Sequence, residues 1–354
     1  MKKLSTIIIL SFIGFASFAQ DIHFVQTSST PILLNPGATG VFQGWERVSV
    51  AHRQQWFTLG APYVTSQISA DLNLFKQTQN KQKAYMGIGL NFYNDVAGDG
   101  KLGTNQGSLL VSGIVNITEN QTLSAGIEIG AAQQSIKMQN LTWSSQFDGE
   151  GFDSSIIPGE GNSAATLIYA DLGAGIFYNM QNVTSTMSRK EVQRLYAGVS
   201  YYHLTTPTRE FYNGSTDQLS TKLVGQIGAE LDVPNSKFVF APSFAIFLQG
   251  PNTEILGTLA GKFRIKEGTK YTGIYNNTYL SFGLNYRSQD AIAPMLGMEI
   301  ANYRFGVAYE FNISPLQSST NSQGSFEVTF QWANFQNALF QGRRTKGFKK
   351  PGGM

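Results

Sequence analysis

Hydrophobic and polar side chains alternate along much of this chain, with the period of two residues that is typical of β-strands. In the stretch GSFEVTFQW, residues 324–332, every second side chain is apolar and those between are polar or small. A strand with one apolar face must bury that face against a protein core or against membrane hydrocarbon. The make-up of the two faces decides between these environments.

After residue 45 the chain divides into about fourteen alternating segments, separated by clusters of Gly, Asn, Asp, Ser and Pro. Each segment is close to or longer than the ~9–11 residues that a tilted strand needs to cross a membrane. An even number of strands is typical of bacterial membrane barrels. The predicted strands cover residues 45–56, 63–75, 83–95, 104–117, 121–135, 165–180, 191–204, 218–232, 236–249, 252–266, 271–288, 291–301, 302–314 and 324–332.

The polar faces of these strands carry the charged residues. In LSAGIEIGA, residues 123–131, Ile127 and Ile129 lie on one face, whereas Gly126 and Glu128 lie on the other. A charge on the lipid face costs ~2–4 kcal/mol near the bilayer midplane, so lipid selects strictly for this separation. The charged residues predicted to point away from lipid are Glu128, Asp171, Arg194, Lys222, Glu230, Glu254, Lys262, Arg264, Arg287, Glu299, Arg304, Glu310 and Glu327.

Charge separation alone does not distinguish a barrel from a soluble β-sandwich or a soluble two-domain protein. Glycine does, because Gly weakens a strand unless another segment approaches it closely, as happens inside a small barrel. The glycines of the polar faces are Gly126, Gly130, Gly173, Gly175, Gly198, Gly228, Gly283, Gly297 and Gly306.

Composition supports the same fold. Charged residues make up 14% of the chain, against roughly 25% in ordinary soluble domains. Gly (37 residues) and aromatic residues (12%) are abundant, and no apolar segment long enough for a spanning helix follows residue 20. We therefore predict an all-β fold: a closed antiparallel transmembrane β-barrel of about fourteen strands over residues 45–332, surrounded by outer-membrane lipid.

Both ends of the chain differ from the alternating body. Residues 1–19 have two lysines, an apolar run and a small-x-small cleavage site, which predicts a secretory signal peptide. The run is shorter than the ~20 residues of a spanning helix, and the absence of cysteine argues against a lipoprotein. Residues 20–44 show no alternation and are a candidate plug. Residues 333–354 form a basic tail, predicted to be periplasmic, that contains Arg343, Arg344, Lys346, Lys349 and Lys350 and no acid.

Two further stretches, residues 136–164 and 205–217, do not alternate. Long connections in membrane barrels usually lie on the extracellular side, so these loops are candidates for partner contact. The first contains FDGEGFD, whose acids lack the ordered spacing of a calcium-binding loop and are interpreted as a solvated surface.

The sequence offers no arrangement for catalysis. The chain has three histidines (His23, His52 and His203) and no cysteine. It lacks the motifs of serine hydrolases and zinc proteases, although a barrel phospholipase stays formally open. No cofactor, metal or phosphate site is indicated, and nucleic acid is an implausible partner outside the cytoplasm. We predict a non-enzymatic protein.

Residues 31–74 and the closing segment YEFNISPLQSSTNSQGSFEVTFQW resemble the PorP/SprF family. Members have Leu-Asn-Pro near the mature N-terminus followed by Ala-Gly, then Arg-x-Gln-Trp at the end of the first strand and Gly-Ala-Pro beyond it. The matching residues here are Leu34, Asn35, Pro36, Ala38, Gly40, Arg53, Gln55, Trp56, Gly60, Ala61 and Pro62.

The resemblance implies an outer-membrane component of the type IX secretion system of a Gram-negative bacterium, which serves protein export and gliding motility. It implies three kinds of partner: the translocon, the periplasmic machinery and the C-terminal domain of a secreted adhesin. A diffusion channel or hydrophobic-solute transporter with a plugged lumen is the alternative.

The motif residues also have a physical interpretation. Asn35-Pro36-Gly37 is a turn, because Asn caps its own backbone, Pro fixes φ and Gly admits a positive φ. We expect Arg53 to face the lumen and to pair with Asp71 on the next strand. We place Trp56 in an interfacial aromatic belt.

Overall fold

The structure is a computed structural model that describes residues 21–57, 60, 62–76, 83–137, 140–157, 165–185, 190–209, 218–266, 278–315 and 317–335. The predicted signal peptide 1–19 lies outside the described residues, as do the five basic residues of the tail and parts of the two long loops.

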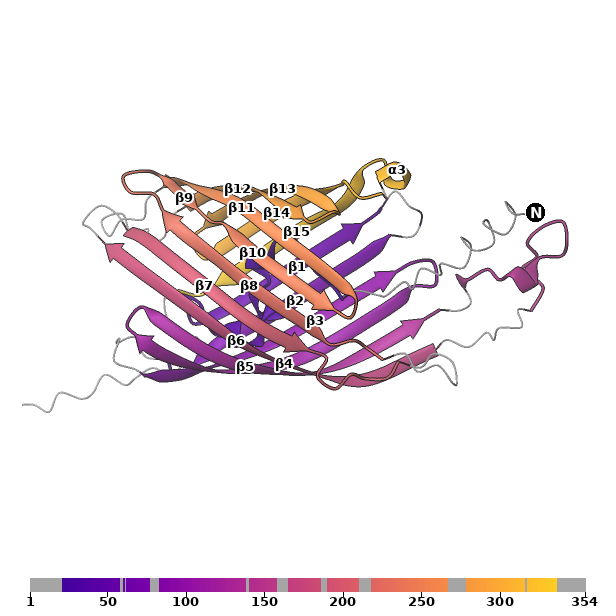
Figure 1. Ribbon diagram of the computed structural model, residues 1–354, viewed down its shortest axis with the longest axis horizontal. Coiled ribbons are helices and arrows are strands. Elements are labelled where there is room, and N and C mark those ends of the chain that lie inside the picture. The colour runs from indigo at the N-terminus through magenta and orange to yellow at the C-terminus, as the bar shows by residue number, and fades with distance from the viewer. Residues whose placement is uncertain are drawn as a thin grey trace, which may run out of the picture.

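In the described part of the chain, fifteen strands form one antiparallel sheet that closes on itself (Figure 1). They are β1 (Glu46–Gln55), β2 (Tyr63–Leu74), β3 (Ala84–Ala97), β4 (Leu102–Thr118), β5 (Gln121–Ile136), β6 (Ala165–Ser185), β7 (Lys190–Tyr202), β8 (Lys222–Asp232), β9 (Phe238–Phe240), β10 (Ser243–Gln249), β11 (Asn252–Lys266), β12 (Thr278–Arg287), β13 (Ala291–Ile300), β14 (Tyr303–Asn312) and β15 (Gln323–Ala333).

The fifteen strands occupy fourteen positions around the barrel. β9 and β10 both pair with β8 on one side and with β11 on the other, so they are two halves of one interrupted strand. β15 pairs with β1 and completes the ring. The predicted closed barrel of about fourteen antiparallel strands is confirmed.

The two faces of the wall agree with the predicted alternation. Large apolar residues such as Leu90, Ile127 and Phe305 are exposed on the outside, where lipid covers them. Charged residues such as Glu128 and Arg264 are buried on the inside. The lipid-facing and lumenal faces thus follow from the period of two in the sequence.

The two ends of the barrel differ, and we name them by their connections. The loop end carries the β5–β6 and β7–β8 connections, and the turn end carries the short β4–β5 and β13–β14 turns. In Figure 1 the described part of the β5–β6 loop extends far beyond the loop end. Antiparallel order places the start of β1 and the end of β15 together at the turn end, where Trp45 N donates to Asn334 O at 2.8 Å.

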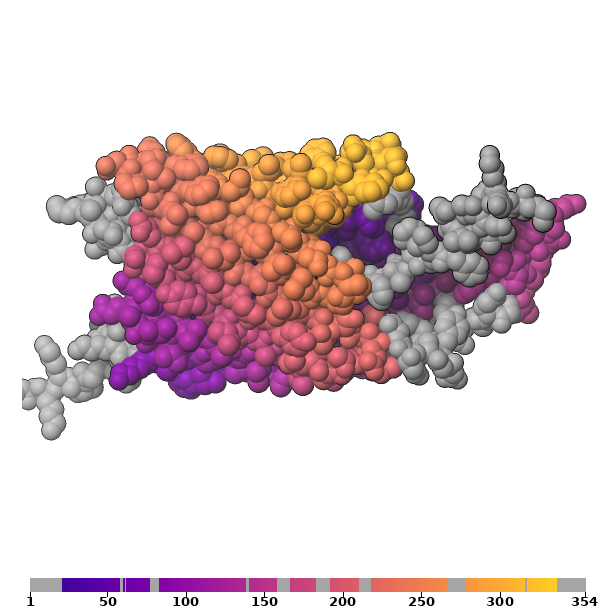
Figure 2. Space-filling view, viewed as in Figure 1, coloured from indigo at the N-terminus to yellow at the C-terminus, as the bar shows by residue number. Residues whose placement is uncertain are grey.

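Residues 21–44 lie inside the barrel and contain the short helices η1 (Thr27–Ser29), α2 (Pro31–Leu34) and η2 (Pro36–Ala38). The other described helices are η4 (Ser144–Gln146) and α3 (Gln317–Thr320). No described helix is long and apolar enough to cross a membrane. In Figure 2 indigo atoms from the N-terminal part of the chain are seen recessed behind the rim formed by later strands.

Candidate functional site

The predicted turn at Asn35-Pro36-Gly37 forms as the start of the short helix η2 and docks onto the lumenal wall, but Gly37 does not have the positive φ that the sequence allowed for. Asn35 Oδ1 accepts from Gly37 N at 2.8 Å, which caps the turn. Asn35 Nδ2 donates to two wall carbonyls, those of Ile176 at 3.0 Å and Val199 at 3.3 Å. The fully buried Asn35 side chain thus joins the turn to β6 and β7.

The wall holds this segment mainly through its backbone. Ser112 Oγ donates to Thr39 O at 2.6 Å, and Ser200 Oγ donates to Leu34 O at 2.6 Å. Three more such bonds join Ser124 Oγ to Gly37 O, Tyr202 Oη to Leu33 O and Gly40 N to Asp71 Oδ2. These contacts secure the course of the segment without depending on its side chains.

Wall glycines leave the space in which the segment lies. A Cβ at Gly126 would collide with Pro36 O, and a Cβ at Gly175 would collide with Asn35 Oδ1. Gly40 has a φ of +74°, in the left-handed region that favours glycine.

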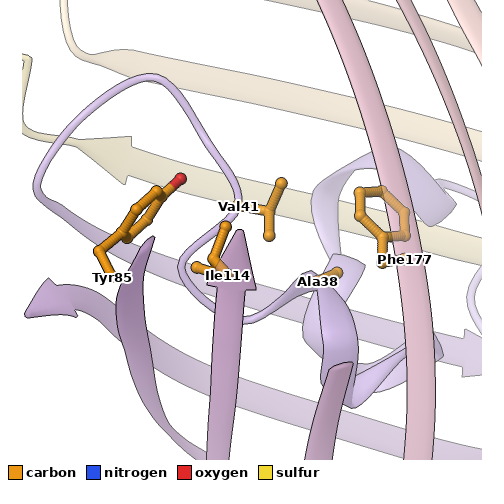
Figure 3. Packing of buried hydrophobic residues seen from close by; sticks show 5 residues of the cluster. All are labelled: Ala38, Val41, Tyr85, Ile114 and Phe177. Carbon is orange, nitrogen blue, oxygen red and sulfur yellow. The ribbon is translucent and has the colours of Figure 1, made fainter. Parts of the chain in front are cut away.

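An apolar cluster lies beside the turn, between the N-terminal segment and the barrel wall. Ala38 and Val41 of the segment pack against Tyr85, Ile114 and Phe177 of the wall (Figure 3). All five residues are buried, so this part of the lumen contains a small apolar core. Together with the backbone bonds, the core fixes residues 33–41 against the wall.

The first residues of the segment are bound differently, by ionisable groups. Glu327 accepts from Val25 N at 2.8 Å and from Gln26 N at 2.9 Å. Further toward the loop end, Asp21 contacts His203 at 2.6 Å and Lys222 at 3.3 Å. His203 also contacts Asp171 at 2.9 Å, so its ring lies between two carboxylates.

The protonation of this cluster follows from its charges. Burial opposes charging of the His203 ring, but the carboxylates of Asp21 and Asp171 outweigh it and raise the pKa of His203 to about 9. Burial raises the pKa of Asp21, but the nearby Lys222 and His203 outweigh burial and hold the pKa of Asp21 well below its usual range. At neutral pH the contact is therefore an ion pair.

His23 is held as a neutral ring. Burial and the nearby Arg53, Arg287 and Lys222 lower the pKa of His23 well below 6.5. Arg287 Nη1 lies 2.7 Å from His23 Nε2, and His23 Nδ1 lies 3.4 Å from Glu254. A neutral ring with its proton on Nδ1 satisfies both contacts.

Arg53 does face the lumen, but its expected pairing with Asp71 is wrong. Arg53 binds Glu310 at 2.9 Å, and Arg47 binds Asp71 at 2.7 Å. The register explains the difference, because Asp71 stands directly opposite Arg47 whereas Arg53 stands opposite Thr65.

The remaining motif residues lie at the loop end of β1 and β2, away from the docked turn. Gln55 stands opposite Tyr63, and Trp56 packs edge-on against the Tyr63 ring at 5.1 Å. Trp56 N donates to Gly324 O at 2.7 Å. Gly60 and Pro62 belong to the same connection. The motif therefore divides into a lumenal group (Asn35, Pro36 and Gly40), a wall cation (Arg53) and a loop-end group.

Sequence reasoning missed the wall residues that hold the segment. Ser112, Ser124 and Ser200 lie on the lumenal face, as their parity in the sequence indicates, but parity does not reveal what they bind. The parity of Glu327 predicts its lumenal position. It does not predict that Glu327 accepts hydrogen bonds from two backbone N–H groups of the segment.

The docked segment fills only one side of the lumen. A hollow lies between residues 25–29 and the inward faces of β7, β8 and β10–β14. Its lining is mostly small or polar, and it includes Glu230, Lys262, Glu299 and Arg304. We call this space the lumenal hollow.

The family model for the type IX secretion system membrane protein PorP/SprF matches residues 16–332. The chain belongs to this family. The match includes the whole barrel and the lumenal segment. No curated protein matches the chain.

Solved structures with a similar shape include the CymD monoaromatic hydrocarbon channel, at 11% identity and a TM-score of 0.44 over 86% of this chain and 92% of that one. The Pseudomonas putida toluene transporter TodX is 8% identical, with a TM-score of 0.44 over 90% of this chain and 99% of that one.

Proposed function

We propose that this PorP/SprF barrel is a non-enzymatic binding component of the type IX secretion system in the outer membrane, and that it receives or anchors the C-terminal domain of a secreted adhesin. The observation that carries the proposal is the occupied lumen. Residues 33–41 are fixed to the wall by backbone hydrogen bonds and a buried core, which suits a scaffold better than an open pore.

The proposal assigns the loop end to the cell surface and the turn end to the periplasm, by the rule that long connections face outward. In the described part of the β5–β6 loop three large apolar side chains are exposed: Phe147 (60%), Phe152 (55%) and Ile157 (82%). These residues lie beyond the strands, where lipid does not cover them. Exposed apolar groups of this kind mark interaction sites, so we assign the adhesin contact to loops 136–164 and 205–217.

The test is surface display of the adhesin in a strain that lacks this gene and is complemented with variants. Wild-type complementation restores display, and the double variant Phe147→Ser/Phe152→Ser restores it at least fivefold less well. Phe335→Ser, which changes an exposed aromatic residue at the turn end, is the matched control and restores display fully. Undiminished display without the gene would refute the proposal.

The basic tail supplies the periplasmic contact in this proposal, through Arg343, Arg344, Lys346, Lys349 and Lys350. A chain ending at Phe335 keeps the barrel intact and tests the tail alone. We expect this truncation to reduce co-purification of the other secretion components while barrel assembly stays normal.

The alternative, a channel or hydrophobic-solute transporter, draws support from the lumenal hollow, which leaves part of the lumen unfilled. Liposome swelling with small sugars distinguishes the two. A sealed barrel favours the secretion role, whereas steady permeation favours the channel.

A further inference from the structure

A row of polar side chains crosses the outer face of β1–β5. Its members stand opposite one another from strand to strand, and they are His52, Ser66, Asn94, Asn105 and Gln133. Each is half-buried or exposed, and none is a Lys, Arg, Asp or Glu. The outward residues of β13 and β14, in contrast, are apolar or aromatic over the whole length of both strands. We call these five polar residues the outer polar row.

The row begins midway across the lipid-facing wall. Along β1, His52 lies four residues from Trp56 at the loop end and four from Val48, which stands opposite Trp332 near the turn end. Trp residues of membrane barrels gather at the two lipid–water interfaces. His52 and its neighbour Ser66 therefore lie between the two interfaces, at the depth of the hydrocarbon.

Hydrogen bonds within the row satisfy only some of its polar groups. His52 Nδ1 lies 2.9 Å from Ser66 Oγ, and Asn94 Nδ2 donates to Asn105 Oδ1 at 2.7 Å. No described residue bonds to His52 Nε2, to Asn105 Nδ2 or to the Gln133 amide. Hydrocarbon offers no hydrogen-bond partner, so polar groups left unpaired in it are costly. A surface with polar groups at the same depth would remove this cost.

Lipid headgroups do not suit the row. They lie at the interfaces, away from the depth of His52 and Ser66, and their phosphates are bound by Lys and Arg. The row contains neither of these residue types. Its chemistry instead fits a membrane-embedded protein surface that carries uncharged donors and acceptors.

A second copy of this chain presents such a surface. His, Ser, Asn and Gln side chains each contain a donor and an acceptor, so each can pair with its own kind. A two-fold axis along the membrane normal places equal residues of two barrels at equal depth. His52 and Ser66 of one barrel would then meet the same pair of the other. The exposed Ile68 and Phe92, which stand opposite each other beside the row, extend this contact with apolar area.

We propose that two copies of this barrel associate side by side in the membrane through the outer polar row, with β1 and β2 at the centre of the contact. This contact goes beyond the proposed function, which concerns the loops and the basic tail. It leaves the lumen of each barrel unchanged and gives both barrels the same orientation in the membrane.

Cysteine cross-linking tests the contact, since the chain has no cysteine of its own. Phe57→Cys places an exposed thiol at the loop end, directly after Trp56. Pro251→Cys places one in the β10–β11 connection, at the same end but on the opposite side of the ring. In lipid vesicles a short bismaleimide is expected to give at least fivefold more covalent dimer with Phe57→Cys. Equal cross-linking at the two positions, or none at Phe57→Cys, would overturn the proposal.

Apolar replacement of the row gives a second test in the Phe57→Cys background. His52→Val/Ser66→Ala removes the polar pair at the centre of the contact and should lower the yield of dimer at least fivefold. Phe282→Val/Leu296→Ala is the matched control, because it changes a facing pair of exposed outward residues on β12 and β13. Heat-modifiable mobility on gels checks that each variant is folded. Undiminished dimer in the first double variant would refute a contact through the row.

Native mass spectrometry distinguishes a second copy from other occupants. Wild-type barrels released from lipid nanodiscs should contain two copies, and the His52→Val/Ser66→Ala variant should contain one. A wild-type barrel that is a monomer when pure, but whose Phe57→Cys variant is cross-linked to a different membrane protein in cells, would assign the row to that protein. The second-copy proposal would then be wrong.

Discussion

At the scale of single residues, His203 is one of the ionisable groups that hold the first residues of the lumenal segment. Its pKa is raised from 6.5 to about 9 by Asp21 and Asp171, so the ring is charged at neutral pH and attracts the Asp21 carboxylate. A raised pKa means that this contribution is complete below pH 6.5 and is lost as the pH rises through about 9. Asp21, with its lowered pKa, contributes above about pH 3.8 and loses its contribution only in strong acid.

A spin label tests this pH dependence. The chain has no cysteine, so Ile22→Cys gives a single labelling site beside Asp21. We expect an immobilised label at pH 6 that becomes mobile between pH 8 and 10. In the His203→Gln background the label should be mobile at pH 6 and show no transition in this range. A label that stays immobile in that background would assign the attachment to other contacts.

The wall glycines allow a matched comparison. Gly175→Ala places a methyl group against Asn35, and Gly126→Ala places one against Pro36. Overpacking of this kind costs about 1–3 kcal/mol. We expect both variants to expose residues 21–44 to protease while the barrel still forms. Gly113→Ala and Gly257→Ala are the controls, because a Cβ at either position meets no atom within 4 Å.

These residues also show what the sequence can and cannot predict. A glycine on the lumenal face of a strand implies that another segment approaches that strand closely. This inference can be made from the sequence of the one strand. The identity of the approaching group depends on contacts across the lumen, such as Asn35 with Ile176, between residues 141 positions apart. Arg53 illustrates the same limit, since its partner depends on a strand register that parity does not determine.

At the scale of elements, most predicted strands agree with the structure within a few residues, because lipid enforces the alternation along each strand. The segment predicted at 236–249 divides into β9 and β10 at Ala241-Pro242. The wall stays bonded across the break, since Ala241 N donates to Ala260 O at 2.8 Å and Ala229 N donates to Pro242 O at 2.9 Å. Phe240 and Phe244 both remain exposed on the outside. Pro has no N–H and interrupts the strand's hydrogen bonding at this point. The alternation of outward and inward side chains nevertheless continues from β9 into β10.

At the scale of the whole molecule, the two ends of the described chain lie at opposite ends of the barrel. Asp21 contacts residues at the loop end, whereas Asn334 pairs with Trp45 at the turn end. Residues 21–44 therefore run the length of the lumen before β1 begins. We expect an epitope inserted before Asp21 to bind antibody on intact cells, and an epitope after Met354 to bind only after permeabilisation. Antibody access to the C-terminal epitope alone would reverse the proposed orientation.

One side of the lumen is filled by residues 33–41 and the other side is the lumenal hollow. This arrangement predicts how ion conductance through the barrel depends on residues 21–44. Residues 33–41 are fixed by a buried core and backbone hydrogen bonds, whereas residues 21–30 are held by ionisable groups and border the hollow. Deletion of residues 21–30 should therefore leave the docked turn in place and join the hollow to the loop end.

Planar-bilayer recording measures this effect. The full barrel should show little current, and the deletion variant should show stable channels, while Gly113→Ala serves as a folded control with wild-type current. The wild-type barrel should also open more often at pH 10 than at pH 6, because deprotonated His203 no longer binds Asp21. Large, steady currents from the wild type at pH 6 would show that the ionisable anchor does not close the lumen, and the channel alternative would then explain the barrel better than the scaffold does.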